Sequence, residues 1–190
     1  MDLQKIALHA EEYARAEIKK YNVPEMTHLD ISIDKGIEIA NKLGANVDIV
    51  KIGVCLMDVK LGQAFHEKRI PEHIKMSSDA SKEFLNKFSL DEQTVNNIIA
   101  CVESHHGKDT FDTLEAEITA NADCYRFIFP KGIFFFFTVL GRRFGDDLPK
   151  IISTVESKMD EKINIVSLPL VKKELEPIYN NMKSYFALSK

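Results

Sequence analysis

The chain has 190 residues, of which 45% are hydrophobic, so it is long enough to bury the core of one domain. Its formal net charge of -4 at pH 7 gives no general case for binding nucleic acid or a membrane surface. Cys55, Cys101 and Cys124 lie far apart in apolar helical patterns, which favours buried thiols in a reducing cytoplasm over a disulfide or zinc framework.

Apolar residues recur at intervals of three and four along the chain, and no segment shows the sustained alternation of a half-buried strand. The sequence therefore predicts an all-α fold in one domain, residues 1–190. The expected helices run to about Lys20 after an N-cap at Asp2, from about Thr27 to Leu43, from near Val47 to about Phe65, from Pro71 to about Leu85, from a Ser89 and Glu92 capping box to Ser104, from Thr113 to Pro130, from about Gly132 to Phe144, from Leu148 to about Lys162, and from about Ser167 to Phe186.

No expected helix is a membrane span. The first 20 residues lack the apolar core of a signal peptide. The longest apolar run, Ile133 to Leu140, is far shorter than the roughly 20 residues that a membrane helix needs. We expect a cytoplasmic protein that does not interact with membranes.

The most hydrophobic stretch of the first half, Ile49 to Phe65, carries the carboxylate of Asp58 between apolar neighbours. An ionised group buried there costs several kcal/mol, on the order of a lost buried ion pair, unless a partner or a metal neutralises it. The candidate partners are histidines on other expected helices: His28, His73, His105 and His106. A further carboxylate, Asp123, lies in a later apolar helix.

In chain order these residues are His28, Met57-Asp58, His73, His105-His106 and Asp123. The pattern resembles the HD-domain superfamily of metal-dependent phosphohydrolases, over roughly Thr27 to Pro130. The resemblance implies an HD-like helical core at residues 27–130 and a C-terminal helical extension, residues 131–190, packed on that core. An unrelated helical bundle with scattered histidines is the alternative.

The resemblance implies two sets of metal ligands that share Asp58. In the first set, His28, Asp58 and Asp123 match three of four ligands, but Met57 stands where the family has histidine. A thioether is a weak, soft donor that suits the divalent ions of such sites, Mn, Fe, Co, Ni, Zn or Mg, poorly. In the second set, Asp58 is joined by His73, His105 and His106, so we expect a bound ion to be displaced toward this set.

Three residues are candidates for catalysis or phosphate binding: Asp58, Lys60 and Arg126. Lys60 is displaced from the family's lysine position, and a solvated lysine is the slightly favoured alternative. Arg126 follows Asp123 by three residues, near the same helix face, and its planar fork suits a phosphate. An ion pair between Arg126 and a surface carboxylate is equally open.

Phenylalanines cluster at residues 127–137. Core packing is the default expectation for them, although they would also suit a substrate base or the interface of a homodimer.

Two functions are open. The first is a metal-dependent phosphohydrolase that acts on a nucleotide or another small phosphate ester, with an altered metal site. The second is a degenerate HD-fold protein that binds a nucleotide or metal, or serves a structural role, without turnover. Met57 is the feature that separates them.

Overall fold

A computed structural model describes residues 2–189 of the chain. The helices are α1 (Leu3–Tyr21), α2 (Met26–Leu43), α3 (Val47–Leu56), α4 (Leu61–His66), the 3-10 turn η1 (Ile70–Glu72), α5 (His73–Leu85), α6 (Glu92–Ser104), α7 (Leu114–Ile128), α8 (Pro130–Phe144), α9 (Leu148–Ile163) and α10 (Pro169–Leu188). Residues 2–189 contain no strand, and the prediction of an all-α fold is confirmed.

Short polar side chains determine where several helices begin. Asp2 caps α1 as predicted, by accepting a hydrogen bond from the backbone N–H of Gln4 at 3.1 Å. The predicted capping box of Ser89 and Glu92 is wrong, because Asp91 caps α6 instead and accepts from the Thr94 N–H at 2.8 Å. An aspartate in the capping position satisfies a free helical N–H without help from Ser89.

The predicted helix from Val47 to Phe65 is broken between α3 and α4. The Leu61 N–H bonds back to the Asp58 carbonyl at 2.9 Å, which is a turn rather than an α-helical spacing. The Lys60 N–H leaves the helix ladder and donates to the Ser77 hydroxyl of α5 at 3.1 Å. The break places Asp58 at a turn, where its side chain reaches residues of other helices.

Helix α3 forms the centre of the bundle, in contact with α1, α2, α5, α6 and α7. Its sequence allows close approach, because a Cβ at Gly53 would lie 2.5 Å from the Cβ of Cys101 on α6. Ile52, Val54 and Leu56 are buried in the main core. The segment that leads to Asp58 is thus fixed by packing on all sides.

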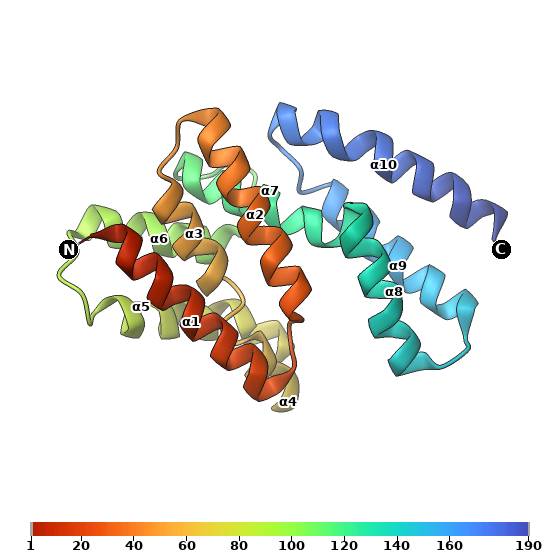
Figure 1. Ribbon diagram of the computed structural model, residues 1–190, viewed down its shortest axis with the longest axis horizontal. Coiled ribbons are helices and arrows are strands. Elements are labelled where there is room, and N and C mark those ends of the chain that lie inside the picture. The colour runs from red at the N-terminus through yellow and green to blue at the C-terminus, as the bar shows by residue number, and fades with distance from the viewer. Residues whose placement is uncertain (1, 190) are drawn as a thin grey trace.

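The last three helices, α8, α9 and α10, lie together at one end of the molecule (Figure 1). They share a second apolar cluster that includes Ile133, Val155 and Phe186. They are also attached to the first part of the chain: Leu175 of α10 belongs to the main core, and Glu174 accepts a hydrogen bond from the Tyr125 hydroxyl of α7 at 2.7 Å. The division into an HD-like core and an extension stays a prediction.

Within residues 2–189, no single helix has the length and hydropathy of a membrane span. Helices α7 and α8 pass that test only as a pair, with a bend of 60° between them.

Candidate metal centre

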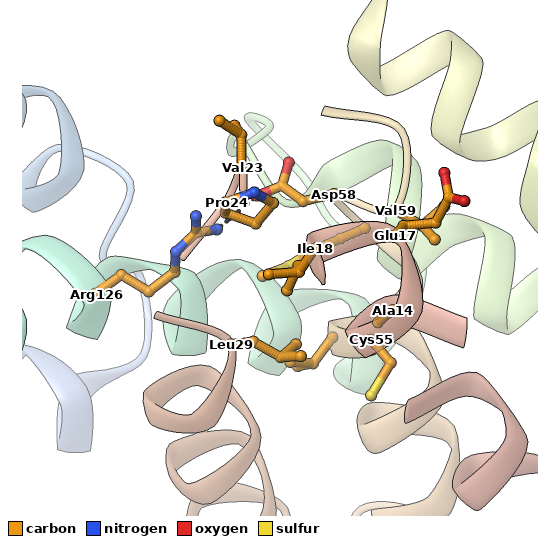
Figure 2. A pocket seen from close by; sticks show the side chains of 12 residues that line it. Ala14, Glu17, Ile18, Val23, Pro24, Leu29, Cys55, Asp58, Val59 and Arg126 are labelled. Carbon is orange, nitrogen blue, oxygen red and sulfur yellow. Dashed lines mark hydrogen bonds and ion pairs between the residues drawn. The ribbon is translucent and has the colours of Figure 1, made fainter. Parts of the chain in front are cut away.

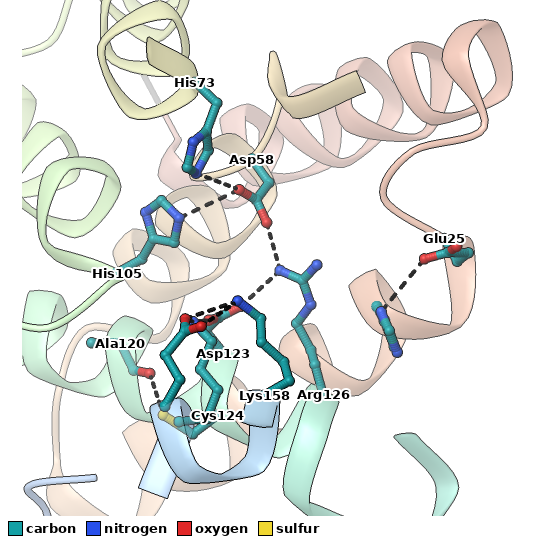
Figure 3. A network of polar contacts seen from close by, with 12 residues as sticks. Glu25, Asp58, His73, His105, Ala120, Asp123, Cys124, Arg126 and Lys158 are labelled. Carbon is teal, nitrogen blue, oxygen red and sulfur yellow. Dashed lines mark hydrogen bonds and ion pairs between the residues drawn. The ribbon is translucent and has the colours of Figure 1, made fainter. Parts of the chain in front are cut away.

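Asp58 lies at the turn between α3 and α4, almost wholly buried, and its two carboxylate oxygens face different partners (Figure 3). Oδ2 accepts a hydrogen bond from Nη1 of Arg126 at 2.5 Å. Oδ1 faces two imidazole nitrogens, Nε2 of His105 at 3.3 Å and Nε2 of His73 at 3.7 Å. The structure therefore brings Asp58 together with both of these predicted ligands.

Backbone carbonyls orient both imidazoles. Nδ1 of His73 lies 2.7 Å from the Ile70 carbonyl oxygen, and Nδ1 of His105 lies 2.7 Å from the Val102 carbonyl oxygen. A carbonyl only accepts, so each Nδ1 carries the hydrogen and each neutral ring presents a lone pair on Nε2. Helix η1 and the end of α6 thus hold both lone pairs toward Asp58.

The resulting arrangement is a group of acceptors without a donor. Asp58 Oδ1 and His105 Nε2 are both buried and have no hydrogen-bond partner. Such orphaned acceptors cost about 1–3 kcal/mol each, unless a cation lies between them. Ligand atoms at about 2.1 Å from one ion lie about 3.0–3.5 Å apart, close to the distances observed here.

His106 completes the group from the loop after α6. One ligand atom each from His73, His105 and His106 lies within 4.8 Å of the others. Unlike the other two, His106 is exposed, and Gly107 ends the turn with a φ of 87°. Three imidazoles suit a divalent metal of intermediate hardness, so these residues fit such an ion, and Asp58 Oδ1 lies beside two of them.

The other predicted carboxylate, Asp123, is already neutralised by side chains. Its Oδ1 accepts from Nη1 of Arg126 at 2.7 Å, and its Oδ2 accepts from Nζ of Lys162 at 2.6 Å. All three side chains are buried. Arg126 Nη1 therefore bonds to both Asp58 and Asp123, at the place where the first ligand set would hold an ion.

The charges of this cluster stabilise each other. Burial raises the pKa of Asp58, but the Arg126 guanidinium more than offsets it and holds that pKa well below 3.8. Burial also raises the pKa of Asp123, but the charges of Lys162 and Arg126 outweigh this effect and lower that pKa below its ordinary value. Burial would lower the pKa of Lys162, but Asp123 raises it above its ordinary value. All four groups are therefore charged at neutral pH.

His28 lies on α2 in an aromatic setting, with its ring centroid 5.1 Å from that of Phe127 and 5.8 Å from that of Phe135. Its Nδ1 is 3.6 Å from Glu25, and its buried Nε2 has no hydrogen-bond partner. Burial and the charge of Arg126 lower the pKa of His28 to about 3. His28 is thus neutral at pH 7, but the three-histidine group does not include it.

Met57 is buried beside Asp58 and lines a small cavity. Asp58 and Arg126 line the same cavity (Figure 2). The volume of this cavity is about 10 Å³, which is room for about one water molecule. The remaining lining is mostly apolar and comes from α1, α2 and α3, including Ile18, Leu29 and Val54. Met57 also packs in the main core, as an apolar side chain does.

Lys60 points toward α1 instead of toward solvent. Its ammonium lies 2.9 Å from Glu17, and only 20% of its side chain is exposed. This ion pair argues against the solvated lysine, while a contact with phosphate stays a prediction. For Arg126, the ion pair is with two buried carboxylates instead of a surface one.

Sequence reasoning missed Lys162. The signal was its position on α9, where it continues the buried stripe of Ile151, Val155 and Met159 at helical spacing. A lysine on an apolar stripe requires a buried anion, and Asp123 is that anion. Thus α9, from the C-terminal helices, supplies a residue to the centre.

No protein-family model matches the chain, and no curated protein matches it. Two solved structures are similar in fold. The crystal structure of YpgQ from Bacillus subtilis has a TM-score of 0.68 at 18% identity, and the match covers 99% of this chain and 95% of that one. A predicted HD superfamily hydrolase from an uncultured Thermotogales bacterium has a TM-score of 0.61, also at 18% identity, with 89% and 91% covered. The chain therefore has the helical fold of an HD superfamily hydrolase, as its residue pattern predicted.

Proposed function

We propose that the protein is a metal-dependent phosphohydrolase that acts on a nucleotide or another small phosphate ester. The observation that carries this proposal is the convergence of lone pairs from His73 and His105 on the free oxygen of Asp58. The fold shared with a predicted HD superfamily hydrolase supports the same reaction class.

Asp58, His73, His105 and His106 would hold the metal. A divalent ion there would lower the pKa of a bound water and neutralise charge on a phosphoryl group. The chain's own residues prepare this position: carbonyls of Ile70 and Val102 fix the rings, and Arg126 fixes Asp58. The exposed edge of His106 gives a substrate an approach from solvent.

Charge balance favours a phosphate as the substrate group. The two carboxylates, Asp58 and Asp123, are matched by two cations, Arg126 and Lys162, so the buried cluster sums to zero. The histidines add no charge when neutral, so a divalent ion leaves an excess of two positive charges. A phosphate monoester dianion would compensate that excess.

Arg126 is also a candidate for a phosphate contact. Both hydrogens of its Nη1 are used by Asp58 and Asp123, but its buried Nε has no hydrogen-bond partner. This N–H is the donor that a phosphate oxygen would use. The small cavity means that a nucleotide would bind mainly outside it, on the His106 side.

The test is elemental analysis of protein purified without added metal, followed by assays against nucleotides, phosphomonoesters and phosphodiesters. Asp58→Asn should lose both metal and hydrolysis, because it removes the charge of the shared ligand. Asp30→Asn is the matched control: it breaks an ion pair with Arg15 outside the centre and should leave both unchanged.

A second variant guards against misfolding. His106 is exposed, so His106→Gln should change the free energy of unfolding by no more than about 0.5 kcal/mol. Its metal affinity should fall by about tenfold or more. Full metal content in both variants would refute the assignment, and metal binding without hydrolysis would favour the non-catalytic alternative.

A further inference from the structure

The position between Asp58 and Asp123 is filled by the chain itself. We infer that Arg126 and Lys162 replace a metal ion there, so that the chain binds one divalent ion, at Asp58 and the three histidines, instead of two. This inference rests on the metal site of the proposed function.

The carboxylate oxygens differ in whether they already have a cationic donor. Each oxygen of Asp123 already accepts from a cation, Oδ1 from Arg126 and Oδ2 from Lys162. Asp58 has one oxygen without such a donor, because Arg126 occupies Oδ2 and leaves only Oδ1. That remaining oxygen faces His73 and His105, so the geometry directs the only open carboxylate oxygen of the pair to the histidine group.

The charges of the buried cluster also disfavour an ion between the two carboxylates. Both cations are buried, and each carboxylate is held by at least one of them. Together the four side chains are neutral, so an ion inserted between the carboxylates would meet a guanidinium at contact distance and no uncompensated negative charge. The histidine group contains no arginine or lysine, since it consists of three imidazoles next to one carboxylate oxygen.

The other possible ligands of the first set do not favour an ion there either. Besides the two carboxylates, the first ligand set offers His28 and Met57. Met57 contributes only a neutral thioether, and its side chain packs in the apolar core. His28 is free at Nε2, but one imidazole does not replace two carboxylates that are already engaged.

The experiment is a count of bound Mn²⁺ in the full chain, by elemental analysis after desalting and by electron paramagnetic resonance. Wild type should bind one Mn²⁺ and give the six-line spectrum of an isolated ion. Two ions with an exchange-coupled spectrum would overturn the inference, because a bridging Asp58 would then hold both.

Removal of the guanidinium tests its role directly. Arg126→Met should bind a second Mn²⁺, and Mn²⁺ should raise its Tm by more than it raises the Tm of wild type. Arg15→Met is the matched control, since Arg15 is also an ion-paired arginine but lies outside the centre, and it should stay at one ion. Arg126→Lys, which keeps the charge, should also stay at one.

If Arg126→Met stays at one ion with the wild-type shift in Tm, the inference is wrong. If Arg126→Met does not fold, the wild-type count of bound Mn²⁺ still decides. The proposed function is tested separately. One bound ion without hydrolysis would refute phosphohydrolase activity but not the replacement of a metal ion by Arg126 and Lys162. Two bound ions with hydrolysis would refute only that replacement.

Discussion

Asp58 has two oxygens with two different roles. Oδ2 is neutralised by Arg126, which makes it tolerable for an ionised carboxylate to lie in the most apolar part of the chain. Oδ1 has no donor and faces two imidazole lone pairs. Without the arginine, the carboxylate would carry a desolvation cost of several kcal/mol, about the cost of a broken buried ion pair. Without the free oxygen, it would have nothing to offer a metal.

Substitution of Met57 tests whether its side chain packs in the core or binds the metal. Its side chain is buried among apolar residues, so Met57→Leu preserves volume and should lower the free energy of unfolding by less than about 1.5 kcal/mol. Metal content should be unchanged, because leucine replaces a packing residue and not a ligand. Urea unfolding and elemental analysis measure the two quantities. Loss of metal in a variant of normal stability would show that the thioether is a ligand.

At the scale of elements, the centre depends on where helices stop and how closely they pack. The turn between α3 and α4 presents Asp58, the end of α6 presents His105, and α7 presents Asp123 and Arg126 one turn apart. Close contact between α3 and α6 keeps the first two together, and it requires a residue without a Cβ at Gly53.

Two glycine substitutions separate packing from helix propensity. Gly53→Ala would place a Cβ 2.5 Å from Cys101 Cβ, and the overpacking cost of about 1–3 kcal/mol should exceed the gain in helix propensity of about 0.8–1.0 kcal/mol. Gly141→Ala, in α8, meets nothing within 4 Å and should stabilise by about 0.5–1 kcal/mol. Thermal unfolding of both variants provides the comparison. Equal effects would contradict the close packing of α3 on α6.

At the scale of the whole molecule, the centre joins residues from position 58 to position 162. Lys162 of α9 pairs with Asp123 of α7, which connects the last helices to the centre by a buried ion pair. Asn121 of α7 reinforces this attachment by accepting from the Ser167 N–H at 3.1 Å. The C-terminal helices are therefore part of what makes the buried charges sum to zero.

The buried groups give the metal-free protein a defined pH dependence. Because the pKa of His28 is about 3 in the folded state and 6.5 is its ordinary value, only the unfolded chain binds a proton at His28 between these pH values. His28 should therefore make the free energy of unfolding fall as the pH falls through this window, by up to about 1.4 kcal/mol per pH unit. His106 adds a fall in the same direction, because burial lowers its pKa to about 3 as well. Below about pH 3.8, Asp58 and Asp123 lower the free energy of unfolding further. Their pKa values are lowered in the folded state, so the unfolded chain binds protons at these carboxylates first.

Urea unfolding in the presence of EDTA, at intervals from pH 7 to pH 4, measures this dependence. His28→Leu removes one of the two titrating rings and should reduce the slope between pH 6.5 and pH 4 without abolishing it, because His106, whose pKa is also lowered to about 3, still contributes. His9→Leu is the control, because His9 is exposed on α1. An unchanged slope in His28→Leu would show that His28 is not the group responsible.

Local sequence patterns were enough to predict the fold class and the order of the candidate ligands. Periodicity along one helix is a local property, so the all-α fold, most helix bounds and the caps at Asp2 and Thr113 can be predicted from neighbouring residues. The HD-like order of Asp58 and the histidines predicted which side chains would converge, and the three-histidine group beside Asp58 follows that order.

The tertiary structure alone decided how the charges pair. The break after α3 depends on Ser77 of α5, and the neutralisation of Asp123 depends on Lys162, 39 residues further along the chain. Such pairings join groups that are distant in sequence, and no local pattern encodes the distance between them. A charged residue in an apolar segment implies a partner, because burial of an unpaired charge is too costly. Only the packing of the helices determines whether that partner is a side chain or a metal ion.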